Sequence, residues 1–143
     1  MASSRPKEAH VRTSTQTVSI AAPAEAVFDF VSDLERLPAW AIGFAKGVRK
    51  DNGSWLVTIG SGEELPIRID GDRERGVLDF WFGPVGAEVP ATTRVVGNDG
   101  GAEYMFTMFQ PPGMPDAVFD AQIAELGREL TVLKAHVESA CPL

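Results

Sequence analysis

The chain has 143 residues, of which 44% are hydrophobic and 23% are charged, values typical of one globular domain with a substantial core. Its formal net charge is −7 and its Lys and Arg residues form no basic stripe, which argues against binding to nucleic acid or to anionic membranes. No apolar run approaches the ~20 residues that a membrane span needs, no secretory signal is recognisable, and the single cysteine, Cys141, belongs to no metal-binding pattern. We therefore expect a cytoplasmic protein that uses neither a metal nor a cofactor.

The first part of the chain predicts a tail, a strand and the start of a helix. Residues 1–14 are mostly small, polar or charged and predict a frayed tail, so the domain is expected over 15–140. The first strand is expected from Thr15 to Ile20, where polar and apolar residues alternate. Pro23 suits the first turn of a helix, and the apolar residues that follow it recur at helical spacing.

A bend is expected within this helical segment. Ser32-Asp33-Leu34-Glu35 matches a capping box, in which the first side chain accepts a hydrogen bond from the backbone at a helix start. Pro38 interrupts the helical pattern shortly afterwards. Two short helices are therefore predicted, the second running towards Trp40.

The middle of the chain, from Phe44 to Gln110, predicts a β-meander. Short apolar runs alternate there with turn signals, of which Asn52-Gly53 and Asp99-Gly100 are the strongest because these residues tolerate the positive φ of two-residue hairpin loops. Together with the first strand, the segment completes a sheet of seven strands. The six strands of the meander are expected at 44–50, 55–60, 64–70, 77–83, 89–97 and 102–110.

A long helix is predicted after Pro115. Six apolar residues follow at alternating steps of four and three, which is one continuous helical stripe. Most charged residues of the segment fall elsewhere on the helical wheel. The stripe consists of Phe119, Ile123, Leu126, Leu130, Leu133 and Val137. The element order predicts an α+β helix-grip fold, in which a curved antiparallel sheet wraps around the C-terminal helix and two short helices connect the first and second strands.

Four segments resemble the START and Bet v 1-like superfamily, and within it the bacterial polyketide cyclase/dehydrase-like proteins. Val18 to Asp33 is similar to the family's first strand and first helix, and Leu37-Pro-Ala-Trp40 is similar to its short second helix. Phe106 to Met114 and Glu129 to Lys134 resemble the last strand with its turn and the later turns of the final helix. The resemblance extends over roughly residues 15 to 138 and concerns structural motifs, which specify fold better than activity.

The resemblance implies a deep cavity between the sheet and the C-terminal helix. The first expectation for its function is the binding of a small hydrophobic or aromatic ligand. The second is a cofactor-free cyclase or dehydratase, in which the cavity folds a substrate and a carboxylate moves protons. The third is an interaction domain that resembles chaperone activators and has little cavity.

Hairpin geometry sorts the side chains of the last three strands into two faces. A two-residue loop at Asp99-Gly100 places Val95 opposite Tyr104 and Thr93 opposite Phe106. A hairpin centred near Gly86 places Asp79 opposite Arg94 and Leu78 opposite Val95. The more apolar face should contact the helix; it holds Leu78, Phe80, Phe82, Ala91, Thr93, Val95, Tyr104, Phe106 and Met108. The outward face holds Asp79, Trp81, Arg94, Glu103, Met105 and Thr107, and its exposed Trp81 suggests a possible homodimer contact.

Ten residues are expected to contact the ligand. Apolar burial would drive binding, and the hydroxyl of Tyr104 or Thr93 would orient the ligand. Gly127 lies inside the predicted long helix, where glycine costs roughly 1 kcal/mol relative to alanine, and would leave room for the ligand or for a closely packed strand. The set consists of Trp40, Phe80, Phe82, Thr93, Tyr104, Phe106, Met108, Phe119, Ile123 and Gly127.

No catalytic constellation is recognisable in the sequence. His10 lies in the expected tail and His136 near the end of the long helix, so neither forms a triad. Among the acidic residues, Asp79 is the first candidate because aspartate is disfavoured in strands, with Arg94 as its partner. An outward pair is the simpler interpretation, since burying both charges is costly. The other candidate carboxylates are Glu63, Glu64 and Glu103.

Overall fold

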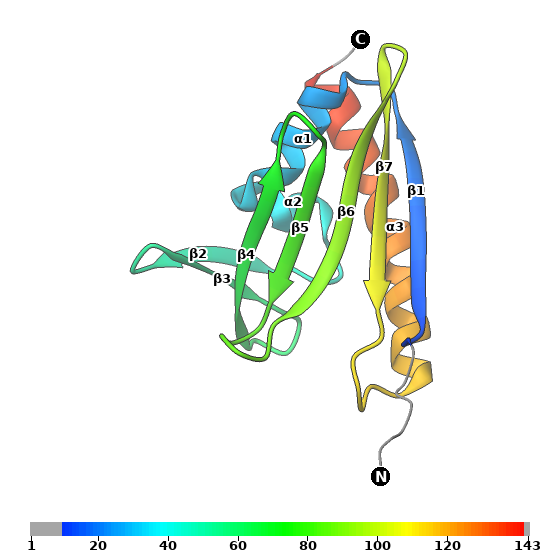
Figure 1. Ribbon diagram of the computed structural model, residues 1–143. Coiled ribbons are helices and arrows are strands. Elements are labelled where there is room, and N and C mark those ends of the chain that lie inside the picture. The colour runs from blue at the N-terminus through cyan, green and yellow to red at the C-terminus, as the bar shows by residue number, and fades with distance from the viewer. Residues whose placement is uncertain (1–9, 142–143) are drawn as a thin grey trace.

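Seven antiparallel strands form one open sheet in the order β1-β7-β6-β5-β4-β3-β2, and the helices cover one of its faces (Figure 1). The computed structural model describes residues 10–141. The predicted helix-grip architecture is confirmed. The strands are β1 (Thr13–Ile20), β2 (Gly47–Asp51), β3 (Ser54–Thr58), β4 (Glu64–Asp72), β5 (Val77–Phe82), β6 (Val89–Asn98) and β7 (Gly101–Phe109), and the helices are α1 (Ala24–Ser32), the 3₁₀ turn η1 (Leu34–Arg36), α2 (Leu37–Trp40) and α3 (Asp116–Ala140).

β1 begins two residues earlier than predicted. Thr13 and Ser14, assigned from the sequence to the tail, pair with Phe109 and Met108 of β7. The rest of the predicted tail falls mainly outside the described residues. Pairing continues to Ile20, so β1 lies along almost the full length of β7 and forms that edge of the sheet.

The bend between α1 and α2 has a different cap from the one predicted. Asp33, not Ser32, caps η1, because its side chain accepts a hydrogen bond from the amide of Glu35. Ser32 is instead the last residue of α1, and its hydroxyl donates to the carbonyl of Asp29. Pro38 lies in the first turn of α2, where its missing N–H costs nothing, and therefore does not interrupt that helix.

The register of β6 and β7 is as predicted, with Val95 opposite Tyr104 and Thr93 opposite Phe106. Asp99 has a φ of 53°, as the two-residue loop requires. The predicted register of β5 and β6 is wrong by two residues, since Asp79 pairs with Thr92. The loop between these strands runs from Gly83 to Glu88, and two of its glycines have positive φ, which moves the centre of the hairpin. A shift of two residues leaves every side chain on its predicted face.

α3 packs most closely against β1. The amide of Gln16 on β1 donates to the carbonyl of Ile123 at 2.8 Å, and the Lys134 ammonium donates to the carbonyl of Ser19 at 2.7 Å. A Cβ on Gly127 would lie 3.1 Å from the amide oxygen of Gln16. Gly127 therefore leaves room for β1, which is the second of the two roles considered for it.

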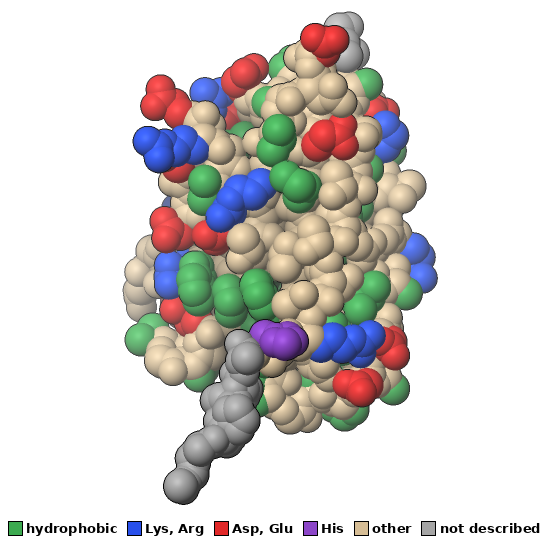
Figure 2. Space-filling model, turned by 45° about the vertical axis from the view of Figure 1, so that its right-hand side comes forward, with side chains coloured by type: hydrophobic (Ala, Val, Ile, Leu, Met, Phe, Trp, Pro, Cys, Tyr) green, Lys and Arg blue, Asp and Glu red, His purple; other side chains and the backbone are tan. Residues whose placement is uncertain are grey.

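The surface mixes charges of both signs. On the face shown in Figure 2, acidic and basic side chains are interspersed and hydrophobic side chains form only small groups. None of the helices within residues 10–141 combines the length and the apolar character that a membrane crossing would need.

Gly76 provides a test of the sheet geometry. It has a φ of 68°, and a Cβ there would lie 2.0 Å from the backbone oxygen of Val95. Gly76→Ala should therefore lower the free energy of unfolding by about 3 kcal/mol or more in urea denaturation. Gly86→Ala is the matched control, because its φ is 89° but no atom lies within 4 Å of the new Cβ, and it should cost only about 1–2 kcal/mol. Equal losses for the two variants would contradict this packing.

Candidate functional site

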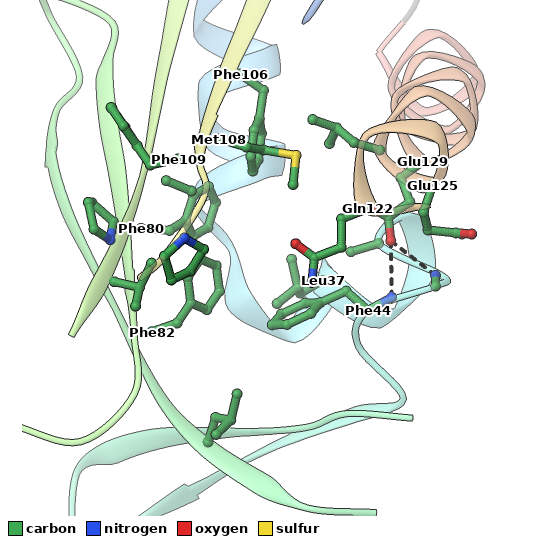
Figure 3. A pocket seen from close by; sticks show the side chains of 18 of the residues that line it. Leu37, Phe44, Phe80, Phe82, Phe106, Met108, Phe109, Gln122, Glu125 and Glu129 are labelled. Carbon is green, nitrogen blue, oxygen red and sulfur yellow. Dashed lines mark hydrogen bonds between the residues drawn. The ribbon is translucent and has the colours of Figure 1, made fainter. Parts of the chain in front are cut away.

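A cavity of about 390 Å³ lies between the sheet, α2 and the first half of α3, and it is partly open to solvent. Most of its wall is apolar, and its polar side chains all come from α3, apart from the indole of Trp40. Figure 3 shows the aromatic side chains of the sheet on one side and α3 on the other. The lining residues are Leu37, Trp40, Ala41, Gly43, Phe44, Leu65, Phe80, Phe82, Val89, Pro90, Ala91, Phe106, Met108, Phe109, Pro111, Met114, Gln122, Glu125, Leu126 and Glu129.

The sheet supplies a continuous aromatic wall. Phe80 and Phe82 point to the same side of β5 because side chains two residues apart share a face. Their rings are stacked at a centroid distance of 6.0 Å, and Phe80 also stacks on Phe106 of β7 at 6.3 Å. Met108 follows Phe106 on the same face, and Figure 3 shows its side chain directed across the cavity towards α3.

The end of α2 and the following loop form a second wall. Phe44, expected in a strand, lies instead in the loop before β2, because the amides of Phe44 and Ala45 both donate to the carbonyl of Ala41. The ring of Phe44 meets Phe82 edge-on at 5.1 Å. Trp40 is only 2% exposed, and its indole Nε1 has no hydrogen-bond partner among the described residues. A buried N–H without a partner is costly, so this group favours an acceptor from outside the protein.

Three polar residues of α3, Gln122, Glu125 and Glu129, complete the lining. They lie three and four residues apart, which places them on one side of the helix. Glu125 pairs with Arg128 and lies over Gly43, where its carboxylate fills the space that a Cβ would take. The Gln122 side chain points into the cavity in Figure 3.

Glu129 is the buried charged residue of this wall, with only 6% of its surface exposed. Its Oε2 accepts hydrogen bonds from the backbone amides of Gly43 and Phe44, both at 3.0 Å (Figure 3). The pKa of Glu129 is raised to about 7, mainly because burial disfavours the charged form. The charge of Glu125 also raises this pKa, whereas the two amides and the charge of Lys46 lower it without offsetting the effect of burial. At neutral pH the carboxyl group is therefore close to half protonated.

Five of the ten residues expected to contact ligand line the cavity: Trp40, Phe80, Phe82, Phe106 and Met108. The other five lie in the packed core or along the junction of α3 with β1. Tyr104 is fully buried, and its hydroxyl has no hydrogen-bond partner among residues 10–141, while burial raises its pKa. The hydroxyl of Thr93 donates to the carbonyl of Leu78 and is thereby satisfied.

The remaining three residues belong to α3. Phe119 is fully buried beneath the Arg12 guanidinium, which lies 5.1 Å from the ring centroid. The backbone carbonyl of Ile123 accepts a hydrogen bond from Gln16 of β1, and Gly127 lies beside the same side chain. Ligand contact by any of the ten residues stays a prediction.

Asp79 and Arg94, the first candidates for catalysis, lie on the outward face of the sheet. Their side chains form an ion pair at 2.8 Å, diagonal to the strand register, and neither lines the cavity. Trp81 is also on this face, where the Arg68 guanidinium covers its ring at 5.2 Å. Among the other candidate carboxylates, Glu63 and Glu64 are exposed, and Glu103 accepts hydrogen bonds from Ser19 and Asn98. Within the described part of the chain, no group of three His, Cys, Asp or Glu side chains could hold a metal ion.

The sequence analysis missed Glu129 as a cavity residue. It was grouped with the charged residues outside the apolar stripe, because helical wheels assign charges to solvent by default. A signal was nevertheless present. Glu129 lies three residues after Leu126 and four before Leu133, so it shares their side of the helix.

The raised pKa of Glu129 has a consequence for stability that can be measured. An acid with a higher pKa in the folded state stays protonated while the unfolded chain ionises, so folding loses stability as the pH rises from about 4.5 to 7. Glu129→Gln removes this loss. The free energy of unfolding of the variant, minus that of the unmodified protein, should increase by up to about 3 kcal/mol from pH 4.5 to pH 7.5. Urea denaturation at each pH measures this difference.

Glu138→Gln is the control on the same helix. Its hydrogen bonds to Lys134 and to the amide of Ala21 lower the pKa of Glu138, so its stabilising effect is complete above about pH 4.5 and is lost only at lower pH. The difference between this variant and the unmodified protein should therefore stay constant from pH 5 to pH 7.5. A constant difference for Glu129→Gln as well would refute the assignment of a raised pKa.

Comparison with known proteins identifies the fold. No protein-family model matches the chain, and no curated protein matches it significantly. Solved structures do match: a START superfamily protein from Mycobacterium smegmatis is 16% identical, with 90% of this chain and 98% of that chain covered and a TM-score of 0.65. The Zhui aromatase/cyclase from Streptomyces sp. R1128 is 19% identical, with 90% of this chain and 94% of that chain covered and a TM-score of 0.66. Ara h 8.0201 is also 19% identical, with 90% of this chain and 99% of that chain covered and a TM-score of 0.66. The chain thus shares its fold with these solved structures, and it is the helix-grip fold that the resemblance over residues 15 to 138 implied.

Proposed function

We propose that this protein binds a small hydrophobic or aromatic molecule in the cavity between the sheet and α3. The observation that carries the proposal is the cavity itself, about 390 Å³ and walled mainly by aromatic and aliphatic side chains. Cavities of roughly 300–1,000 Å³ with an apolar lining and a few convergent polar groups are the usual form of small-molecule sites. An interaction domain of the chaperone-activator type would be expected to have a filled interior instead.

The driving force for binding would be the removal of apolar surface from water. Phe44, Phe82 and Phe106 present rings from three different segments, so a flat ring system could contact several of them at once. The cavity is partly open to solvent, which gives a ligand a route of entry.

Cavity filling gives a direct test of this proposal. Met108→Trp places a larger side chain in the cavity, whereas Met105→Trp makes the same change on the outward face of the same strand. N-phenyl-1-naphthylamine, an uncharged dye that fluoresces in apolar surroundings, should bind the unmodified protein and the Met105→Trp variant. Its affinity should fall about fivefold or more in Met108→Trp. If the dye does not bind, or if it binds both variants equally, the proposed site is wrong.

A second candidate function is proton transfer within the same cavity, and Glu129 is the observation that favours it. A carboxyl group whose pKa is about 7 can both accept and donate protons at neutral pH, which is the property required of a general acid or base. Because Asp79 and Arg94 lie outside the cavity, Glu129 takes their place in this alternative.

The ring opening of 5-nitrobenzisoxazole tests this second function without knowledge of the natural substrate. In this reaction a base removes the ring C–H proton, the N–O bond breaks, and a cyanophenolate forms. If Glu129 acts as a base, the protein should accelerate the reaction with a pH profile that rises through about pH 7, and Glu129→Gln should lower the rate about 100-fold. An unchanged rate in this variant would exclude Glu129 as the base.

A further inference from the structure

The charges that line the cavity are all of one sign. Glu125 and Glu129 are the charged residues among the described lining, and no Lys, Arg or His is part of it. Two cations that act on these carboxylates are already engaged: Arg128 pairs with Glu125, and the Lys46 ammonium donates to the carbonyl of Ile42 at 2.7 Å. With Glu125 paired to Arg128, Glu129 is the lining carboxylate that favours a positive ligand group and opposes a negative one.

Among residues 10–141, Glu129 has no salt-bridge partner, although the charge of Lys46 lowers its pKa. Its Oε2 is held by the two backbone amides of Gly43 and Phe44, while no hydrogen bond from residues 10–141 reaches its Oε1. The amides alone do not offset the cost of burial, since burial still raises the pKa of this carboxyl group to about 7. An ammonium group in the cavity would supply the missing stabilisation of the ionised form.

The rest of the lining also suits a ligand of mixed character. The rings of Phe44, Phe80 and Phe82 offer apolar contact to a hydrocarbon body and π faces to a cation. The indole Nε1 of Trp40, buried without a partner among the described residues, requires an acceptor atom. Trp40 lines the cavity, so a ligand acceptor that reached this nitrogen would remove the cost of leaving it without a partner.

We propose that the cavity selects molecules that join an aromatic or aliphatic body to a basic amine, and that the amine pairs with Glu129. This inference rests on the proposed binding function and adds the class of ligand. It excludes fatty acids and other carboxylates as the preferred occupants, because a second anion beside Glu129 and Glu125 would be repelled.

Three naphthalene compounds with the same body and different charges test the inference. They are 2-naphthylmethylamine, 2-naphthylmethanol and 2-naphthoic acid, each used to displace N-phenyl-1-naphthylamine at pH 8. The amine should bind about 10-fold more tightly than the alcohol, and the acid about 10-fold more weakly. In Glu129→Gln, the preference for the amine over the alcohol, taken as the ratio of the two affinities within that variant, should disappear. In Glu138→Gln, whose side chain lies outside the cavity, the preference should persist.

The pH dependence of the unmodified protein provides a second measurement that needs no variant. The affinity for the amine should rise from pH 6 to pH 8 as Glu129 ionises, and binding should release a proton; the affinity for the alcohol should not rise. Three charged groups surround Glu129. Glu125 and Arg128 belong to α3, and Lys46 belongs to the loop before β2. Among the described residues, the sheet presents no titratable side chain to the cavity.

The two proposals fail in different ways. If the dye binds but the amine is no better than the alcohol, or keeps its advantage in Glu129→Gln, the amine inference is wrong and the binding function stands. If the dye itself does not bind, the proposed function is wrong.

Discussion

The close packing of α3 against β1 determines where the cavity lies. Gly127 has no side chain, and this allows the helix to approach β1 until Gln16 donates to the carbonyl of Ile123. The curved sheet then diverges from the helix towards β5, and the short α2 lies across part of the gap (Figure 1). The space that remains is bounded by Phe80 and Phe82 and becomes the cavity. The same helix thus serves as core packing on one side and as a wall of the site on the other.

Polar and apolar side chains lie on different walls of the cavity. The sheet contributes rings and methionine, whereas α3 contributes Gln122, Glu125 and Glu129. A β-strand that faces a core places every second residue in the same apolar environment, so a polar residue there would need a partner within the sheet, as Thr93 has in the carbonyl of Leu78. A helix edge meets solvent along its length and can carry charge into the boundary of the cavity at lower cost.

Local sequence signals predicted most of the fold, but only five of the twenty residues that line the cavity were among those expected to contact a ligand. Asp99-Gly100 specified the register of β6 and β7, because a two-residue loop admits few geometries. That register in turn determines which residues of β7 face the cavity. The longer loop from Gly83 to Glu88 allows several geometries, so the register of β5 was predicted two residues away from its observed position. Glu129 could not be assigned from periodicity alone, because its burial depends on the loop that brings the amides of Gly43 and Phe44 over it.

The partners of Glu129 are backbone amides, and a backbone amide is present whatever side chain the residue carries. The loop that closes this side of the cavity is therefore anchored independently of its own side chains, provided that position 44 is not proline. Phe44 could be replaced by other residues without loss of the hydrogen bond from its amide to Glu129, although its ring is part of the cavity wall. The shape of the cavity could thus diverge in evolution, or be redesigned, at a position whose substitution leaves the scaffold intact.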